Sequence, residues 1–253
     1  MSQHSTIALV TGSSRGLGKN MAMALAKNGN DLVITYNKNK DEALAVVAEI
    51  NAPGRKACAL QLDVSKSDSW GSFAKALAEA LKANFDSDKF DYLVNNAGID
   101  SPAPFMQTTE EQFDLLMTVH FKSVYFLTQK LVPLMRDGGR IVNVSSGLAR
   151  FSIPGYSAYA AMKGAVEVMT RYMAKELADR KIAVNTVAPG AIETDFTKDH
   201  LAHPGAREMI AGSTALGRVG VPDDIGGVVA FLCSDAGRWV NAQRLEASGG
   251  IFI

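Results

Sequence analysis

Short runs of apolar, often β-branched residues alternate along the chain with longer stretches in which apolar residues recur at helical spacing. Runs that are apolar throughout are typical of strands covered on both faces, whereas a spacing near 3.6 residues predicts helices that bury one face. Strands are expected at residues 7–10, 32–36, 57–62, 92–94, 140–144, 182–187 and 244–247. Helices are expected at residues 21–26, 41–50, 67–81, 110–135, 158–178 and 222–231.

The alternation of strands with helices predicts the fold class. Strands separated by helices run parallel, and right-handed crossovers then place helices on both faces of one doubly wound α/β sheet. We expect a single domain over residues 1–253. The irregular stretch at about 190–215, which contains Pro204, Gly205 and Gly212, is expected to form a substrate loop or lid. A simple surface insertion is the alternative.

The composition excludes several classes of protein. The 253 residues carry 26 Lys+Arg and 26 Asp+Glu, and 47% of them are hydrophobic. High apolar content without net charge argues against a disordered chain. A nucleic-acid partner is not expected, because no basic excess is present to neutralise phosphates.

The cysteine content and the hydropathy of the chain indicate where in the cell the protein is expected to be. Cys58 and Cys233 are too few for a disulfide framework or a four-ligand zinc site, so both are expected to be buried thiols and no metal site is predicted. Neither a signal peptide nor an apolar run of the roughly 18–20 residues that cross a membrane is visible. We therefore expect a cytoplasmic location and no membrane partner.

A glycine-rich turn follows the first predicted strand, where residues 11–18 are Thr-Gly-Ser-Ser-Arg-Gly-Leu-Gly. Glycines between a strand and a helix let backbone amides approach a pyrophosphate at the helix N-terminus. The spacing excludes a nucleoside-triphosphate loop, because Ser13 and Asn20 stand where that pattern requires glycine and Ser/Thr. A turn without a ligand is the alternative. The predicted dinucleotide-binding residues here are Gly12, Ser14, Arg15, Gly16 and Leu17.

The end of the second predicted strand favours one cofactor. Many NAD-binding folds place an acidic residue there to hold the ribose 2′-OH, but this chain has none before Asp41. Arg15 and Lys38 can instead pair with a 2′-phosphate. NADP(H) is therefore favoured, with NAD(H) as the alternative, unless both cations are ordinary solvated surface charges.

Three side chains suggest acid–base chemistry. Tyr159 and Lys163 are four residues apart, so they share one face of a helix, and an adjacent ammonium lowers the pKa of a phenol. Tyr159 is then a candidate general acid or base. Ser145 and Ser146 follow a strand, where a hydroxyl can donate to a substrate carbonyl, but adjacent side chains point opposite ways. The structural alternatives are a core tyrosine with an extended lysine, and serines that cap the strand exit.

Together these motifs resemble the classical short-chain dehydrogenase/reductase family. The similarity covers almost the whole chain and continues through Asn95-Asn96-Ala97-Gly98 and Pro189-Gly190. It implies a Rossmann-like fold and a homotetramer, and it selects Ser146 as the catalytic serine. Within the family, 3-oxoacyl-acyl-carrier-protein reductases are the most similar. The residues that the resemblance adds to the cofactor site are Asn37, Lys38, Asp63, Val64, Asn96, Ala97, Gly98, Tyr159, Lys163, Pro189, Gly190, Ile192 and Thr194. Asp63 is alternatively a helix N-cap.

One residue departs from the family pattern. His120 stands where the family has an asparagine that is thought to bind a water relaying protons to the lysine. Imidazole can hold a water and titrates near neutrality. Three interpretations are open: the same role with altered pH dependence, a bulkier side chain that weakens turnover, or a buried histidine without a catalytic role. We count His120 among the predicted catalytic residues.

The expected protein is an NADP-dependent oxidoreductase that transfers hydride between nicotinamide and a ketone or secondary alcohol. A 3-oxoacyl thioester or a related ketone is the candidate substrate. The alternative is a cofactor-binding sensor or scaffold with weakened catalysis, for which His120 is the only support. A sugar-nucleotide epimerase is disfavoured, because those relatives usually have longer chains and a substrate domain for which no room remains here.

Overall fold

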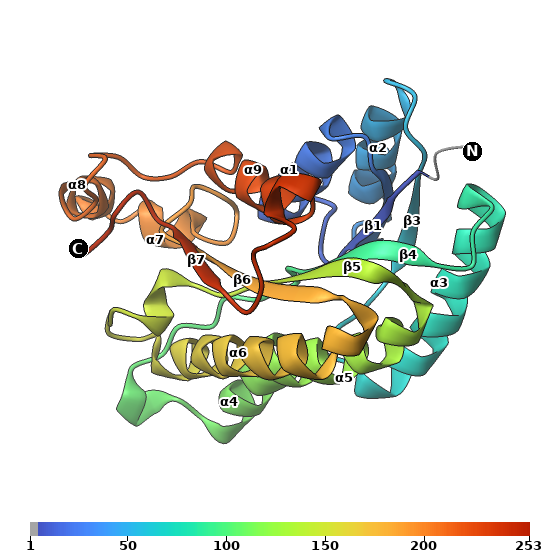
Figure 1. The fold of residues 1–253 in the computed structure, drawn as a ribbon. Helices are drawn as coiled ribbons and strands as arrows, with labels where there is room; N and C mark the ends of the chain where they lie inside the picture. Colours follow the sequence, from blue (N-terminus) through green and yellow to red (C-terminus); the bar gives the residue numbers. More distant parts are fainter. Residues whose placement is uncertain (1–4) are drawn as a thin grey trace.

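The apolar runs form a seven-stranded parallel sheet in the computed structural model, which describes residues 5–253. The strands lie side by side in the order β3-β2-β1-β4-β5-β6-β7 (Figure 1). Their bounds are β1 (Ile7–Val10), β2 (Asp31–Tyr36), β3 (Ala57–Gln61), β4 (Phe90–Asn95), β5 (Met135–Val144), β6 (Ala183–Pro189) and β7 (Arg244–Ala247). The order reverses direction between β1 and β4, and such a switch point marks the ligand-binding edge of an open sheet.

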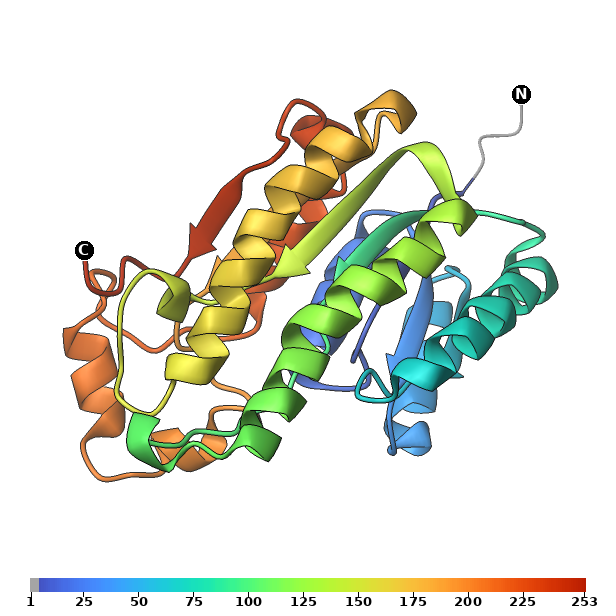
Figure 2. The same cartoon turned by 90° about the horizontal axis from the view of Figure 1, so that it is seen from below.

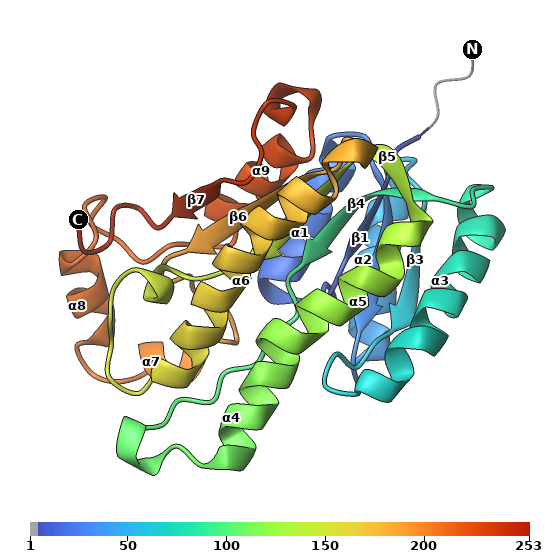
Figure 3. The same ribbon diagram turned by 60° about the horizontal axis from the view of Figure 1, so that its bottom comes forward.

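Helices cover both faces of the sheet, as the alternation predicts (Figures 1 and 2). One face carries α1 (Gly16–Lys27), α2 (Lys40–Asn51) and α9 (Asp223–Leu232). The other carries α3 (Trp70–Phe85), α4 (Glu110–Met117), α5 (Ser123–Leu131) and α6 (Ser157–Glu176). Two short helices, α7 (Lys198–Leu201) and α8 (Ala206–Gly212), lie beyond the carboxyl ends of β6 and β7 (Figure 3). The fold is the predicted doubly wound, Rossmann-like sheet.

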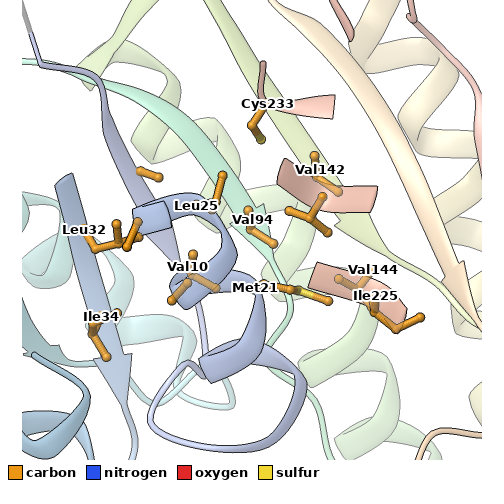
Figure 4. Packing of buried hydrophobic residues seen from close by; sticks show 14 of the residues in the cluster. Val10, Met21, Leu25, Leu32, Ile34, Val94, Val142, Val144, Ile225 and Cys233 are labelled. Atoms are coloured by element: carbon orange, nitrogen blue, oxygen red, sulfur yellow. The ribbon is translucent and has the colours of Figure 1, made fainter. Parts of the chain in front are cut away.

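Each face of the sheet has its own hydrophobic core. On one face, Met21 and Leu25 of α1 and Ile225 of α9 pack over the strand residues Val10 and Val94 (Figure 4). On the other face, apolar residues of α3 and α5 pack against β1, β4 and β5. Because strand residues are buried on both faces, the strands hold the carboxyl edge in a fixed geometry.

The helix expected over residues 110–135 is the main difference from the sequence-based elements. It is divided into α4, a π-helical turn (Thr118–Lys122), α5 and a 3-10 turn (Val132–Leu134). Pro133 ends the helical path, and β5 begins at Met135 because that residue pairs with Phe90 before a register shift. The π-helical turn contains His120, so the irregularity lies at a predicted site residue.

The cysteines differ in burial. Cys233 is buried in the core beside α1 and α9, whereas Cys58 is only partly buried, contrary to the expectation for it. Burial raises the pKa of the Cys58 thiol to about 11 and that of Cys233 to about 12, so both are protonated near neutrality. Within residues 5–253, every helix is too short or too polar to cross a bilayer.

Candidate active site

The glycine-rich turn between β1 and α1 is closely packed. Gly12 has a φ of 63°, and its amide donates to Thr35 Oγ1 at 2.9 Å. A Cβ on Gly18 would lie 2.2 Å from the carbonyl oxygen of Gly12, so only glycine fits there. The first turn of α1 therefore approaches the end of β1, with its free amides at the carboxyl edge of the sheet.

The Asn95–Gly98 segment joins this turn to β4. The Asn96 side chain donates to the carbonyl oxygens of Thr11 at 2.9 Å and Gly12 at 3.1 Å. In return, Thr11 Oγ1 accepts from the amides of Asn96 at 2.9 Å and Ala97 at 3.0 Å. These hydrogen bonds cross the switch point between β1 and β4. They join the glycine-rich turn and the Asn95–Gly98 segment, both of which contain predicted cofactor-binding residues.

The two cations predicted to recognise a 2′-phosphate lie in different surroundings. Arg15 directly precedes α1 and pairs with Asp195, after β6, at 3.2 Å. Both side chains of this pair are about 60% exposed, so the pair costs little to break. Lys38 follows β2 and is exposed, as is Asn37, whose carbonyl oxygen accepts from the Gln61 side chain at 2.9 Å.

The remaining predicted cofactor residues line or support the same edge. Asp63 does not cap a helix: its Oδ1 accepts from the amide and hydroxyl of Ser65 in a turn. Thr194 lies across from Gly16, since a Cβ on that glycine would be 3.9 Å from its side chain. Ser14 lies in the turn itself, and Leu17 and Val64 pack against the hydrophobic cores. Gly98 packs against His120, and Gly190 lies close to Ser248. Pro189 is the last residue of β6, and Ile192 is buried.

Lys163 is a buried cation in α6. Its side chain is 5% exposed, and Nζ donates to the carbonyl oxygen of Val144 at 2.7 Å. The same Nζ lies 5.5 Å from the ring centroid of Tyr159, one helical turn earlier. Burial lowers the pKa of Lys163 to about 8, so the charge is retained near neutrality but held less firmly than in water.

The expectation that Lys163 lowers the pKa of Tyr159 is wrong for this structure. Burial raises the pKa of Tyr159 above its ordinary value, and a hydrogen bond with Ser146 opposes that shift only in part. The free energy needed to remove a phenolate from water is larger than the stabilisation that nearby groups give to that phenolate. Tyr159 is therefore a neutral phenol near pH 7, which is the form that can give a proton.

The two adjacent serines point to opposite sides of the strand exit, as expected. Ser145 is buried and its hydroxyl donates to Glu167 Oε1 at 2.7 Å. Ser146 Oγ instead lies beside Tyr159 and accepts from the amide of Leu148 at 3.2 Å. Arg244 bonds both Glu167, at 2.6 Å, and the carbonyl oxygen of Ser146, at 3.3 Å. A half-buried ion pair thus holds the backbone at Ser146.

His120 packs edge-on against Tyr159. The ring centroids are 4.9 Å apart and the planes meet at 83°. Nε2 lies 2.9 Å from the carbonyl oxygen of Ile99 and 3.3 Å from its amide nitrogen, so either tautomer can bond to that backbone, and Nδ1 is buried without a hydrogen-bond partner among the described residues. Burial, and then the charge of Lys163, lower the pKa of His120 to about 3. The suggestion that this imidazole titrates near neutrality is therefore wrong; it stays neutral.

Comparison with known proteins identifies the family. Residues 12–251 match the family described as Enoyl-(Acyl carrier protein) reductase. An uncharacterised oxidoreductase of Methylorubrum extorquens is 42% identical over 248 residues, or 97% of each chain. A 3-oxoacyl-[acyl-carrier-protein] reductase of Staphylococcus epidermidis is 36% identical over 97% of this chain and 98% of that protein. The chain belongs to the short-chain dehydrogenase/reductase family.

A solved member of the short-chain dehydrogenase/reductase family shows the same fold. The angucycline C-6 ketoreductase LanV, with bound NADP, matches with a TM-score of 0.92 and 35% identity, covering 98% of this chain and 95% of that one. This short-chain dehydrogenase/reductase is accordingly an NAD(P)-dependent oxidoreductase, as the motifs predict.

Several residues that shape this short-chain dehydrogenase/reductase site were missed from the sequence. Glu167 follows Lys163 by four residues and so shares its helix face, a spacing that indicates a neighbour. The contacts of Ile99 with His120 and of Asp195 with Arg15 join distant segments, and no sequence pattern predicts them. The rings of Tyr156 and Phe196, which both lie near Tyr159, were missed for the same reason.

The neutral state of His120 predicts an acid-sensitive contribution to stability. Because the folded pKa is about 3 and the ordinary value is 6.5, the unfolded chain takes up a proton below pH 6.5 that the folded chain refuses. Between pH 7 and pH 5, the wild type should lose about 2 kcal/mol more unfolding free energy than His120→Asn. Urea unfolding at both pH values measures this, with His203→Asn as an exposed control. Equal losses in wild type and His120→Asn would show that His120 is protonated in the fold.

Proposed function

We propose that this protein reduces a ketone to a secondary alcohol with NADPH. The observation that carries the proposal is the neutral, buried phenol of Tyr159 beside the Ser146 hydroxyl, with the Lys163 ammonium in the same helix. A phenol that keeps its proton is suited to giving it to a carbonyl oxygen that becomes an alkoxide. The same group would take the proton back in the reverse oxidation of the alcohol.

The residues present suit a dinucleotide. A Cβ at residue 18 would clash with the carbonyl oxygen of Gly12, so glycine there lets the start of α1 lie close to the end of β1, where its amides can face a pyrophosphate. Arg15 and Lys38 are the cations for a 2′-phosphate, and β2 ends without an acidic residue. LanV, the similar ketoreductase, holds NADP. These features support NADP(H) as the cofactor.

Each proposed catalytic residue has a defined task. When bound, NADPH would supply the hydride that the carbonyl carbon accepts. Ser146 donates a hydrogen bond to the carbonyl oxygen, and Tyr159 Oη transfers its proton there, which completes the alcohol. The Lys163 ammonium stabilises the tyrosinate that is left and can bond the nicotinamide ribose. His120 packs against the phenol ring and holds its position.

The segment at 190–215 is proposed to close over the substrate. It carries α7 and α8, and residues within it contact both ends of the site: Asp195 pairs with Arg15, while Phe196 lies beside Tyr159.

The competing sensor hypothesis rests on His120 alone. Because Ser146, Tyr159 and Lys163 are all present and oriented together, turnover is the better supported function.

A homotetramer in the cytoplasm remains the proposed state of the protein. Exposed apolar side chains gather on the outer helices: Phe113 and Leu115 of α4, Tyr125 and Phe126 of α5, and Val168 and Tyr172 of α6. These helices lie side by side on one face of the molecule (Figure 3). A face of this kind is suited to covering by other copies of the chain.

Substitution of the catalytic hydroxyls tests the proposed reaction. Tyr159→Phe removes the proton donor, and the rate of NADPH oxidation with a ketone should fall about 10²–10⁴-fold while NADPH still binds. Ser146→Ala should cost about 10²–10³-fold, because one donor to the carbonyl oxygen is lost. Ser145→Ala is the matched control and should be mild. A larger loss for Ser145→Ala than for Ser146→Ala would reverse the assignment.

The cofactor assignment is tested by removing the two cations. Arg15→Ala and Lys38→Ala should each raise the KM for NADPH about tenfold, because a charge-assisted bond to the 2′-phosphate is lost. The KM for NADH should change little, as should both values in the control Lys40→Ala. Stronger use of NADH than NADPH by the wild type would contradict the assignment.

A further inference from the structure

Aromatic rings surround the phenol of Tyr159. Tyr156, just before α6, has its ring centroid 6.4 Å from that of Tyr159, and Phe196, after β6, lies 6.2 Å away. His200 of α7 packs edge-on against Tyr156 at 6.5 Å. We call Tyr156, Phe196 and His200 the ring cluster. Its members come from two segments that meet beside Tyr159, so the cluster is a product of the fold.

The ring cluster is not needed to stabilise the core. Phe196 is 39% exposed, and neither Tyr156 nor His200 is fully buried. Phe196 and His200 also belong to the segment proposed to close over the substrate. Rings that stay partly exposed beside a reacting group present their faces and edges to whatever enters.

The charge beside the ring cluster disfavours an anionic substrate. Asp100 follows β4, and its carboxylate acts electrostatically on both Tyr156 and Tyr159. Asp100 is exposed, and partial desolvation raises its pKa above the ordinary value. The Asp100 carboxylate would repel an anionic group beside these rings, whereas a neutral ligand would meet the rings without that repulsion.

We propose that the substrate is an uncharged ketone whose carbonyl belongs to a fused aromatic ring system, which packs against the ring cluster. This inference rests on the proposed function and narrows its substrate class. Each aromatic contact strengthens binding about two- to tenfold beyond the area it buries. A flexible acyl chain gains no such contact and loses rotational freedom when it binds, which weakens its binding by a similar factor for each ordered group. Both effects favour the rigid ring ketone.

A matched pair of probes tests the substrate class. The rates of NADPH oxidation are measured with 2-tetralone, a fused aromatic ketone, and with ethyl 3-oxohexanoate, an acyclic 3-oxo ester of equal heavy-atom count. We expect kcat/KM for 2-tetralone to be about tenfold higher or more. Equal or faster use of the ester would overturn the inference and leave the proposed function standing. Turnover of neither ketone would contradict the proposed function, and the inference with it.

Variants of the ring cluster separate recognition from folding. Phe196→Leu keeps an apolar side chain and removes the ring, so the ratio of kcat/KM for 2-tetralone to that for the ester should fall about threefold to tenfold, chiefly through KM. Tyr156→Leu should lower the same ratio. Phe231→Leu on α9 removes a ring of the same 39% exposure away from the site, and it should leave the ratio unchanged. An unchanged ratio in both cluster variants would overturn the inference.

Discussion

Burial of a phenol and an ammonium together at the ends of the strands is the constraint on which the site depends. Tyr159 is 9% exposed and Lys163 is 5% exposed, and the Lys163 ammonium is satisfied by the carbonyl oxygen of Val144 at the end of β5. The low-dielectric surroundings work against both charged forms: they raise the pKa of the phenol and lower that of the amine. The result is a neutral phenol with a cation in the same helix, which suits the proton transfer proposed for Tyr159.

The surrounding structure holds this arrangement from two sides. At the ends of β1 and β4, Asn96 and Thr11 tie the glycine-rich turn to the end of β4. Between α6 and β7, a chain of ion pairs runs from Glu167 through Arg244 and Glu246 to Arg150, and Arg244 also bonds the Ser146 backbone. Because Arg150 also bonds the carbonyl oxygens of Ile251 and Phe252, these residues are connected to the backbone of Ser146.

The sequence predicted the fold, and it singled out side chains that the structure brings together at the carboxyl edge of the sheet, but it did not predict their electrostatics. Apolar strand runs and helical spacing specify the layers directly, and the opposite orientations of Ser145 and Ser146 follow from the geometry of a strand. The pKa of Tyr159 was predicted to shift in the wrong direction, and that of His120 was predicted in the wrong range. Both errors arise because burial depends on neighbours that are distant in sequence, such as Ile99. The ring cluster and the Arg15–Asp195 ion pair could not be predicted from the sequence for the same reason.

Direct titration of the Tyr159 phenol is the most immediate test of this account. The ionisation of that side chain is followed by the ultraviolet difference between wild type and Tyr159→Phe as the pH is raised, in the folded protein. Burial predicts that no phenolate from Tyr159 forms until the pH exceeds the ordinary tyrosine value of about 10. A phenolate signal from Tyr159 near neutral pH would show that the lysine outweighs burial, and it would contradict the assignment of a neutral proton donor.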